Sequence, residues 1–222
     1  MTSPENDGQI RPEATSDADS NDVSSRREFD KMVAGELYDA SDPELVRIRT
    51  ACKQRCRDFY DVAIGDVEAL RRIAHDVFAA GGDTVTIEPP LIVDYGCNTT
   101  LGRNVYFNAN CVILDVAPVR IGSDVKCGPG VQIYTAGHPL DVATRRVLEF
   151  GQPITIGDDV WIGGGAIICP GVTIGPRSVI GAGSVVTRDI PGDVVAAGTP
   201  CRILRPIEQS GEPRVTPPQP NG

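Results

Sequence analysis

Residues 156–186 read IGDDVW IGGGAI ICPGVT IGPRSV IGAGSV V, which is a six-residue repeat. Five units open with Ile, and Val186 opens the next. Gly follows each Ile except at 169, where Cys takes its place. The fifth position of each unit is mostly small. A period of six matches neither an α-helix of about 3.6 residues per turn nor one continuous strand. It is typical of a solenoid, in which short strands and tight turns alternate and each branched residue stacks on its counterpart in the next coil.

The repeat also extends toward the N-terminus, where it is interrupted once. Ile121, Cys127 and Ile133 keep the same spacing, but the interval from Ile133 to Ile156 is not a multiple of six. We therefore expect a loop at about 137–151 to leave the solenoid, and long loops on rigid scaffolds often carry function.

The remaining chain divides by composition. Residues 1–25 hold almost no apolar residue and are expected to be a disordered acidic tail, and 208–222 a second disordered tail. Residues 26–82 show three apolar stripes at helical spacing, the second opened by a predicted capping box between Ser41 and Glu44. The third stripe leaves out His75, which we expect to be a solvated surface residue. Residues 83–207 form the predicted solenoid domain.

Charge and apolar content limit the partners. The net charge of the 222 residues is −9, and nucleic-acid binding needs clustered Lys and Arg, so no nucleic-acid partner is expected. No run approaches about 18 apolar residues, so we expect no membrane span. The start of the chain lacks the pattern of a secretory signal. We interpret the seven cysteines as reduced thiols of a cytoplasmic protein.

The two histidines set the chemistry that the chain can offer. A zinc site built from three histidines, as in the gamma-class carbonic anhydrases with the same kind of repeat, cannot be assembled from His75 and His138. Cys52 and Cys56 have no second pair nearby, so we expect no metal. His138 stands between Gly and Pro where the solenoid opens into the loop, and His suits proton transfer near neutral pH. A turn histidine held by a structural hydrogen bond would show the same pattern.

Several motifs together resemble the hexapeptide-repeat acyltransferases, and within them the maltose and galactoside O-acetyltransferases. They are Met32–Tyr38, Asp94–Gly96, Asn108–Asp115, Thr135–Asp141, Val160–Gly164, Pro170–Gly175 and Val179–Thr187. The resemblance covers about residues 28–207. It implies a mainly β fold, a left-handed parallel β-helix with a short N-terminal helical segment. It also implies a homotrimer with active sites between subunits, and acetyl transfer from acetyl-CoA to a hydroxyl, usually of a sugar.

The resemblance also assigns roles to residues on the acceptor side. His138 matches the catalytic general base, and Asn108 matches an asparagine that binds the acceptor hydroxyl or the developing oxyanion. Asp94, Tyr106 and Asp115 match positions around the acceptor pocket. From its place in the loop, Glu149 is expected either to orient His138 or to hold the acceptor.

On the CoA side, the corners rich in Gly would let the pantetheine arm lie against the backbone, and late arginines would meet the CoA phosphates. The matched or nearby residues are Trp161, Gly164, Ala182, Thr187, Arg188, Arg202 and Arg205.

The acceptor stays open at this point, because Ala40 stands where some relatives carry an acid, with Asp39 and Asp42 close by. A sugar acceptor is our first interpretation. An amino sugar, an amino-acid hydroxyl or a xenobiotic is the second, and a non-catalytic scaffold is the third. We expect direct transfer and not an acyl-cysteine route through Cys111 or Cys127.

Overall fold

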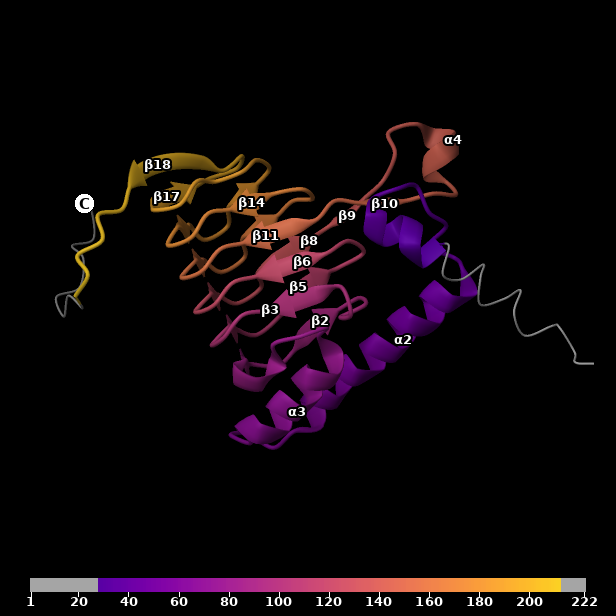
Figure 1. Cartoon of the computed structure of the whole chain (residues 1–222), viewed down its shortest axis with the longest axis horizontal. Helices are drawn as coiled ribbons and strands as arrows, with labels where there is room; N and C mark the ends of the chain where they lie inside the picture. The colour runs from indigo at the N-terminus through magenta and orange to yellow at the C-terminus, as the bar shows by residue number, and fades with distance from the viewer. Residues whose placement is uncertain (1–27, 213–222) are drawn as a thin grey trace, which may run out of the picture.

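The computed structural model describes residues 28–212, most of which form a parallel β-solenoid with three faces (Figure 1). Each face is named here by its first strand. The strands of the β1 face are β1 (Thr86–Ile87), β4 (Tyr106–Phe107), β7 (Lys126–Cys127), β12 (Trp161–Ile162), β15 (Val179–Ile180), β17 (Val194–Ala197) and the antiparallel β18 (Arg202–Pro206). The strands of the β2 face are β2 (Leu91–Val93), β5 (Cys111–Leu114), β8 (Gln132–Tyr134), β13 (Ile167–Ile168) and β16 (Val185–Val186). The strands of the β3 face are β3 (Thr99–Leu101), β6 (Val119–Ile121), β11 (Ile154–Ile156) and β14 (Thr173–Ile174).

The lead residues of the six-residue repeat form the core of the solenoid, as predicted. Ile156 pairs with Ile174 on the β3 face, and Ile162 pairs with Ile180 on the β1 face. One coil therefore takes three repeat units, and all four of these side chains are buried. Each coil buries the apolar side chains of the next one, and this contact between neighbouring coils stabilises the solenoid.

The predicted loop is an insertion that leaves the coil register intact. Ile133 on β8 pairs with Ile168 on β13, although the loop separates the two strands in sequence. Two short antiparallel strands, β9 (Ala136–Gly137) and β10 (Phe150–Gly151), close the base of the loop, and the short helix α4 (Val142–Arg145) lies between them. Figure 1 shows α4 projecting from the solenoid.

The N-terminal helical segment covers one end of the solenoid (Figure 1). Residues 28–34 are helical, and they are followed by α2 (Pro43–Asp58), the 3₁₀ turn η1 (Phe59–Asp61), α3 (Val67–Val77) and the 3₁₀ turn η2 (Gly82–Thr84). The capping box predicted between Ser41 and Glu44 is wrong. Asp42 is the N-cap, and its carboxylate accepts from the N–H groups of Glu44 and Leu45. Ser41 instead donates to Asp39.

A small second core joins this N-terminal segment to the base of the loop. Its buried members are Met32, Tyr38, Leu45, Tyr95 and Val116, and Ala136 of β9 packs against them. The N-terminal segment therefore packs against the chain that leads into the loop.

Three expectations concern the ends of the chain and its surface. The predicted tails lie outside the described residues, except for 208–212. Between residues 28 and 212, none of the helices is long and apolar enough to cross a membrane. His75 is exposed on α3, as predicted, with 71% of its side chain accessible.

Candidate active site

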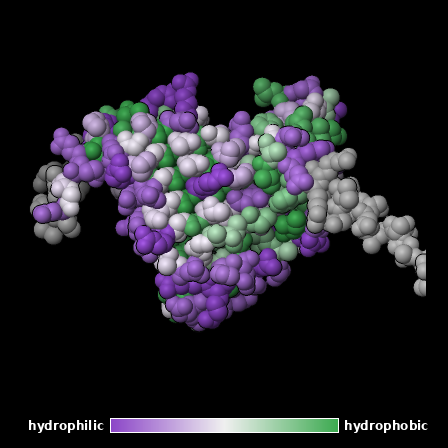
Figure 2. Space-filling view, viewed as in Figure 1, coloured by the Kyte–Doolittle hydropathy of each residue, from purple (hydrophilic) through white to green (hydrophobic). Residues whose placement is uncertain are grey.

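The loop that carries His138 is an ordered element with its own local contacts. Gly137 of β9 pairs with Phe150 of β10, and a Cβ at Gly137 would lie 2.8 Å from the Phe150 ring, so the ring packs directly over this glycine. Asp141 caps α4 by accepting from the N–H of Thr144 at 2.8 Å. These contacts hold the exposed His138 at a defined place above the solenoid. Figure 2 shows an open notch between this projecting region and the β17–β18 end.

Arg145 fixes the backbone directly after His138. Its Nη1 donates to the carbonyl oxygens of Pro139 at 3.3 Å and Leu140 at 3.1 Å. A guanidinium has donors in a fixed planar arrangement and therefore suits two neighbouring carbonyls. Sequence reasoning did not single out Arg145, because the contact depends on how α4 folds back.

Asn108 and Tyr106 lie on the neighbouring coil toward the N-terminus. Tyr106 is half-buried on the β1 face, and Asn108 follows directly at the end of β4. The Asn108 Oδ1 accepts from the N–H of Ala109 at 2.8 Å, so its Nδ2 is the group left to donate to a ligand.

The two aspartates expected near the acceptor differ sharply. Asp94 is half-buried and forms an ion pair with Lys53 of α2 at 2.9 Å. Asp115 is fully buried, and its carboxylate accepts from the N–H of Tyr95 at 2.8 Å and the hydroxyl of Thr99 at 2.9 Å. Burial raises the pKa of Asp115 to about 6. The expected acceptor contact by Asp115 is therefore wrong for this geometry, because its carboxylate holds the turn after β2 from inside.

Glu149 is anchored by a residue far away in sequence. The buried hydroxyl of Tyr38 donates to Glu149 Oε2 at 3.1 Å. The two main chains also exchange hydrogen bonds, from Tyr38 N–H to the Glu149 carbonyl and back, both at 3.0 Å. Burial and the nearby Glu149 carboxylate raise the pKa of Tyr38, so the phenol remains a donor.

A corner between the β1 and β2 faces carries almost no side chain. It comprises residues 108–110, 128–130, 163–165 and 181–183, and we call it the bare corner. Its left-handed positions are Asn110, Gly130, Gly165 and Gly183, with φ between 65° and 68°. At the corner between the β3 and β1 faces, the same kind of position, with φ between 57° and 59°, holds Asn104, Asp124, Asp159, Arg177 and Asp193.

The glycines of the bare corner are of two kinds: some are required for the coils to stack, and others are not. A Cβ on Gly163 would lie 2.5 Å from the backbone nitrogen of Ala182 in the next coil, so stacking requires Gly there. A Cβ on Gly165 or Gly183 would meet nothing within 4 Å. Since the other corner shows that this backbone accepts side chains, the bare corner keeps space open beyond what the fold requires.

Trp161 lies beside the bare corner on β12, with 56% of its surface exposed. In the register of the β1 face it pairs with Lys126, which pairs with Tyr106 in the preceding coil. On its side away from the bare corner, Trp161 borders a surface cavity of about 470 Å³, which is lined by Asp124, Lys126, Asp159, Val160 and Trp161.

The family models and relatives agree on one assignment. The bacterial transferase hexapeptide model matches residues 153–188, and the maltose acetyltransferase hexapeptide capping motif matches residues 31–82. The galactoside O-acetyltransferase of Escherichia coli K12 is 42% identical over 179 residues, which are 80% of this chain and 88% of that protein. The chain belongs to the maltose acetyltransferase family of hexapeptide-repeat proteins.

Solved structures of this family match the whole described fold. A maltose O-acetyltransferase from Clostridium difficile 630 is 45% identical, with a TM-score of 0.80 over 82% of this chain and 98% of that one. A galactoside acetyltransferase in complex with coenzyme A is 40% identical, with a TM-score of 0.75 over 82% of this chain and 91% of that one. Within the maltose acetyltransferase family, this chain is an acetyltransferase.

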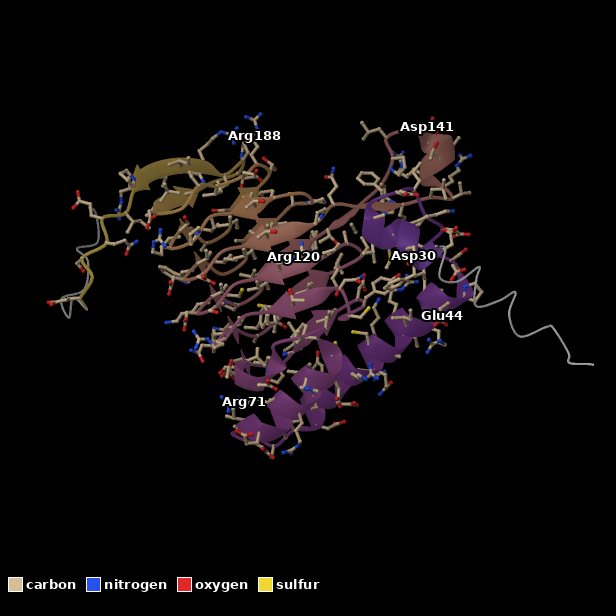
Figure 3. All side chains as sticks on the ribbon, viewed as in Figure 1. Asp30, Glu44, Arg71, Arg120, Asp141 and Arg188 are labelled. Carbon is tan, nitrogen blue, oxygen red and sulfur yellow. The ribbon has the colours of Figure 1, made fainter. Side chains whose placement is uncertain are left out.

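The positions expected to contact CoA lie on three different parts of this family member. Gly164 and Ala182 belong to the bare corner, whereas Thr187 and Arg188 follow β16 at the corner between the β2 and β3 faces. Figure 3 shows Arg188 across the notch from Asp141. Arg202 and Arg205 are exposed on β18. One chain does not bring all of these residues together.

In residues 28–212, no group of three or more His, Cys, Asp or Glu side chains is arranged to hold a metal ion. Burial raises the pKa of Cys111 to about 11 and also raises that of Cys127, which keeps both thiols protonated. Protonated thiols are poor nucleophiles.

Proposed function

We propose that this chain transfers acetyl from acetyl-CoA to a hydroxyl group of a sugar. The observation that carries the proposal is the bare corner. It begins at Asn108, passes Trp161, and keeps open a strip along the solenoid axis that a long, thin ligand would fit. Coils are spaced about 4.8 Å apart, so the distance from Asn108 to Ala182, three coils away, is on the order of 14 Å. The pantetheine arm of CoA has the shape for such a strip.

His138 acts as the general base in this proposal. Its imidazole takes the proton of the acceptor hydroxyl while the oxygen attacks the thioester carbonyl carbon. The carbon–sulfur bond then breaks, and the proton passes to the leaving thiolate, so that CoA departs as the free thiol. The Asn108 amide donates to the acceptor or to the developing oxyanion. Tyr106 and Asp94 contact the acceptor, and the protonated cysteines leave direct transfer as the route.

We also propose that the working unit is a homotrimer with active sites between neighbouring solenoids. Support comes from the separation of Gly164 and Ala182 from Thr187 and Arg188 within one chain. A second copy would bring its own Arg188, Arg202 and Arg205 toward the CoA phosphates.

A non-sugar acceptor is the second candidate. A cavity of about 300 Å³ lies between residues 39–41 and the loop, and it is lined by Asp39, Ala40, Ser41, Arg145, Arg146, Val147, Leu148 and Glu149. The Asp39 carboxylate accepts from the N–H and the hydroxyl of Ser41, so it does not take the place of the acid that is missing at Ala40. A site without that acid would suit an amino sugar, an amino-acid hydroxyl or a xenobiotic as well as a neutral sugar.

Thiol release from acetyl-CoA, measured across a panel of sugars, amino sugars, serine and xenobiotic alcohols, tests the proposal. Turnover with neutral sugars is the expected result. Turnover with only a non-sugar class would select the second candidate. Failure to bind CoA in calorimetry, together with no turnover, would point to a scaffold and overturn the proposal.

A further inference from the structure

Three chain segments lie side by side at the base of the loop. Gly137 pairs with Phe150 in the antiparallel β9–β10 pair, and continuing this register by one residue sets His138 opposite Glu149. On its other side, Glu149 forms an antiparallel bridge with Tyr38. The order across the three segments is therefore Tyr38, Glu149, His138.

The main-chain hydrogen bonds decide how closely these residues approach. Both the N–H and the C=O of Glu149 are bonded to Tyr38, so they point away from His138. His138 and Glu149 thus occupy a non-hydrogen-bonded position of the pair, where opposed Cα atoms are only about 4.5 Å apart and their side chains lie on the same face. Directly paired Tyr38 and Glu149 also share a face, as their side-chain hydrogen bond of 3.1 Å shows.

The Tyr38 hydroxyl has the properties of a fixed anchor. Its side chain is 1% exposed, and Glu149 Oε2 is the acceptor that it meets. A buried hydroxyl needs a partner, and the bond to a carboxylate is among the stronger ones. With Oε2 taken, Oε1 of Glu149 is the oxygen that can turn toward the histidine.

The other charged groups around this row come from α2, from α4 and from the turn before α2. Arg49 of α2 donates to the hydroxyl of Tyr95 at 3.0 Å, next to Tyr38 in the second core. Arg145 of α4 is bonded to the backbone after His138. Asp39 and Arg146 line the cavity that Glu149 also lines.

We propose that Tyr38 is a positioning residue that holds the Glu149 carboxylate opposite His138, so that the N-terminal segment orients the imidazole through one side chain. The inference rests on the proposed role of His138 as the base. It selects the first of the two roles expected for Glu149, orientation of His138, and it adds a residue that lies 111 positions earlier in the sequence.

Titration of the histidine ring signals by NMR tests the arrangement without any need for turnover. The chain has two histidines, and the exposed His75 serves as the internal reference. Glu149→Gln removes a negative neighbour and should lower the pKa of His138 by about half a unit or more. Tyr38→Phe should move the His138 titration in the same direction, by less, while His75 stays unchanged. Tyr95→Phe, which alters the other buried tyrosine of the second core, is the matched control and should leave His138 unchanged.

A double-mutant cycle gives the catalytic counterpart. Tyr38→Phe should lower kcat/KM about tenfold, as expected for a lost hydrogen bond to a charged group, and should have no further effect in a Glu149→Ala background. An equal loss in both backgrounds, or a His138 titration that ignores both Tyr38→Phe and Glu149→Gln, would overturn the inference. Because the NMR result does not depend on acetyl transfer, it separates a failure of this inference from a failure of the proposed function.

Discussion

Gly165→Asn fills the bare corner while leaving its backbone unchanged. Gly165 has φ +68°, and a Cβ there would meet nothing within 4 Å. Asn110 already holds φ 65° at the equivalent position two coils away. An L residue in this region costs about 1–2 kcal/mol, and Asn costs less than most. Replacing Gly also restricts the unfolded chain, which recovers roughly 0.4–1 kcal/mol. The free energy of unfolding should therefore change by no more than about 1 kcal/mol, or roughly 2–4 °C in Tm.

The same variant should bind CoA poorly, because the new amide projects into the strip proposed for the pantetheine arm. We expect the Kd for CoA to rise tenfold or more, equivalent to about 1.4 kcal/mol, as measured by isothermal titration calorimetry. Gly65→Asn is the matched control, because Gly65 also has positive φ with nothing within 4 Å but lies between η1 and α3. A Kd for Gly165→Asn within twofold of both the control and the wild type would refute the assignment of the corner.

Two further predictions concern the loop and the solenoid core. Arg145→Ala should lower kcat about tenfold with little change in the Kd for CoA, because it frees the backbone after His138. Arg146→Ala, the control, should act mainly on the KM of the acceptor. Steady-state kinetics compare the two variants, and equal kcat values would contradict the role given to the Arg145 hydrogen bonds. Burial raises the pKa of Asp115 to about 6, above an unfolded value near 3.9, so the folded protein binds this proton more tightly than the unfolded chain does. The unfolding free energy of the wild type should therefore fall by about 2–3 kcal/mol relative to Asp115→Asn as the pH rises from about 4 to 7. Urea denaturation at several pH values measures this free energy, and the same pH dependence in both proteins would contradict the prediction.

The solenoid could be predicted because its signal is local and repeated. An apolar residue recurs every six positions from Ile156 to Val186, and each of these residues is buried in the structure, as expected. The loop was equally visible, since a broken period needs no knowledge of the fold. The capping error at Ser41 has a simple cause, because Ser41 and Asp42 are both good N-caps and the sequence does not say which one the preceding turn presents to the helix.

The site was harder to predict, because its contacts join distant segments. Asp115 and Asp94 look alike in sequence, yet one carboxylate points into the core and the other pairs with Lys53 on the surface. Tyr38 lay within a recognised motif, but its contact with Glu149 follows from how the N-terminal segment docks against the loop. The sequence does not mark the bare corner, because the glycines that coil stacking requires and those that only keep space open look the same in the repeat.

Acetyl transfer by His138→Ala, compared with His75→Ala, tests the central claim most directly. The account predicts that His138→Ala lowers kcat by about 10²–10⁴-fold, while the Kd for CoA stays within about twofold of the wild type. His75→Ala, which removes the exposed histidine of α3, should keep full activity. Wild-type kcat in His138→Ala, with CoA binding intact, would contradict the account.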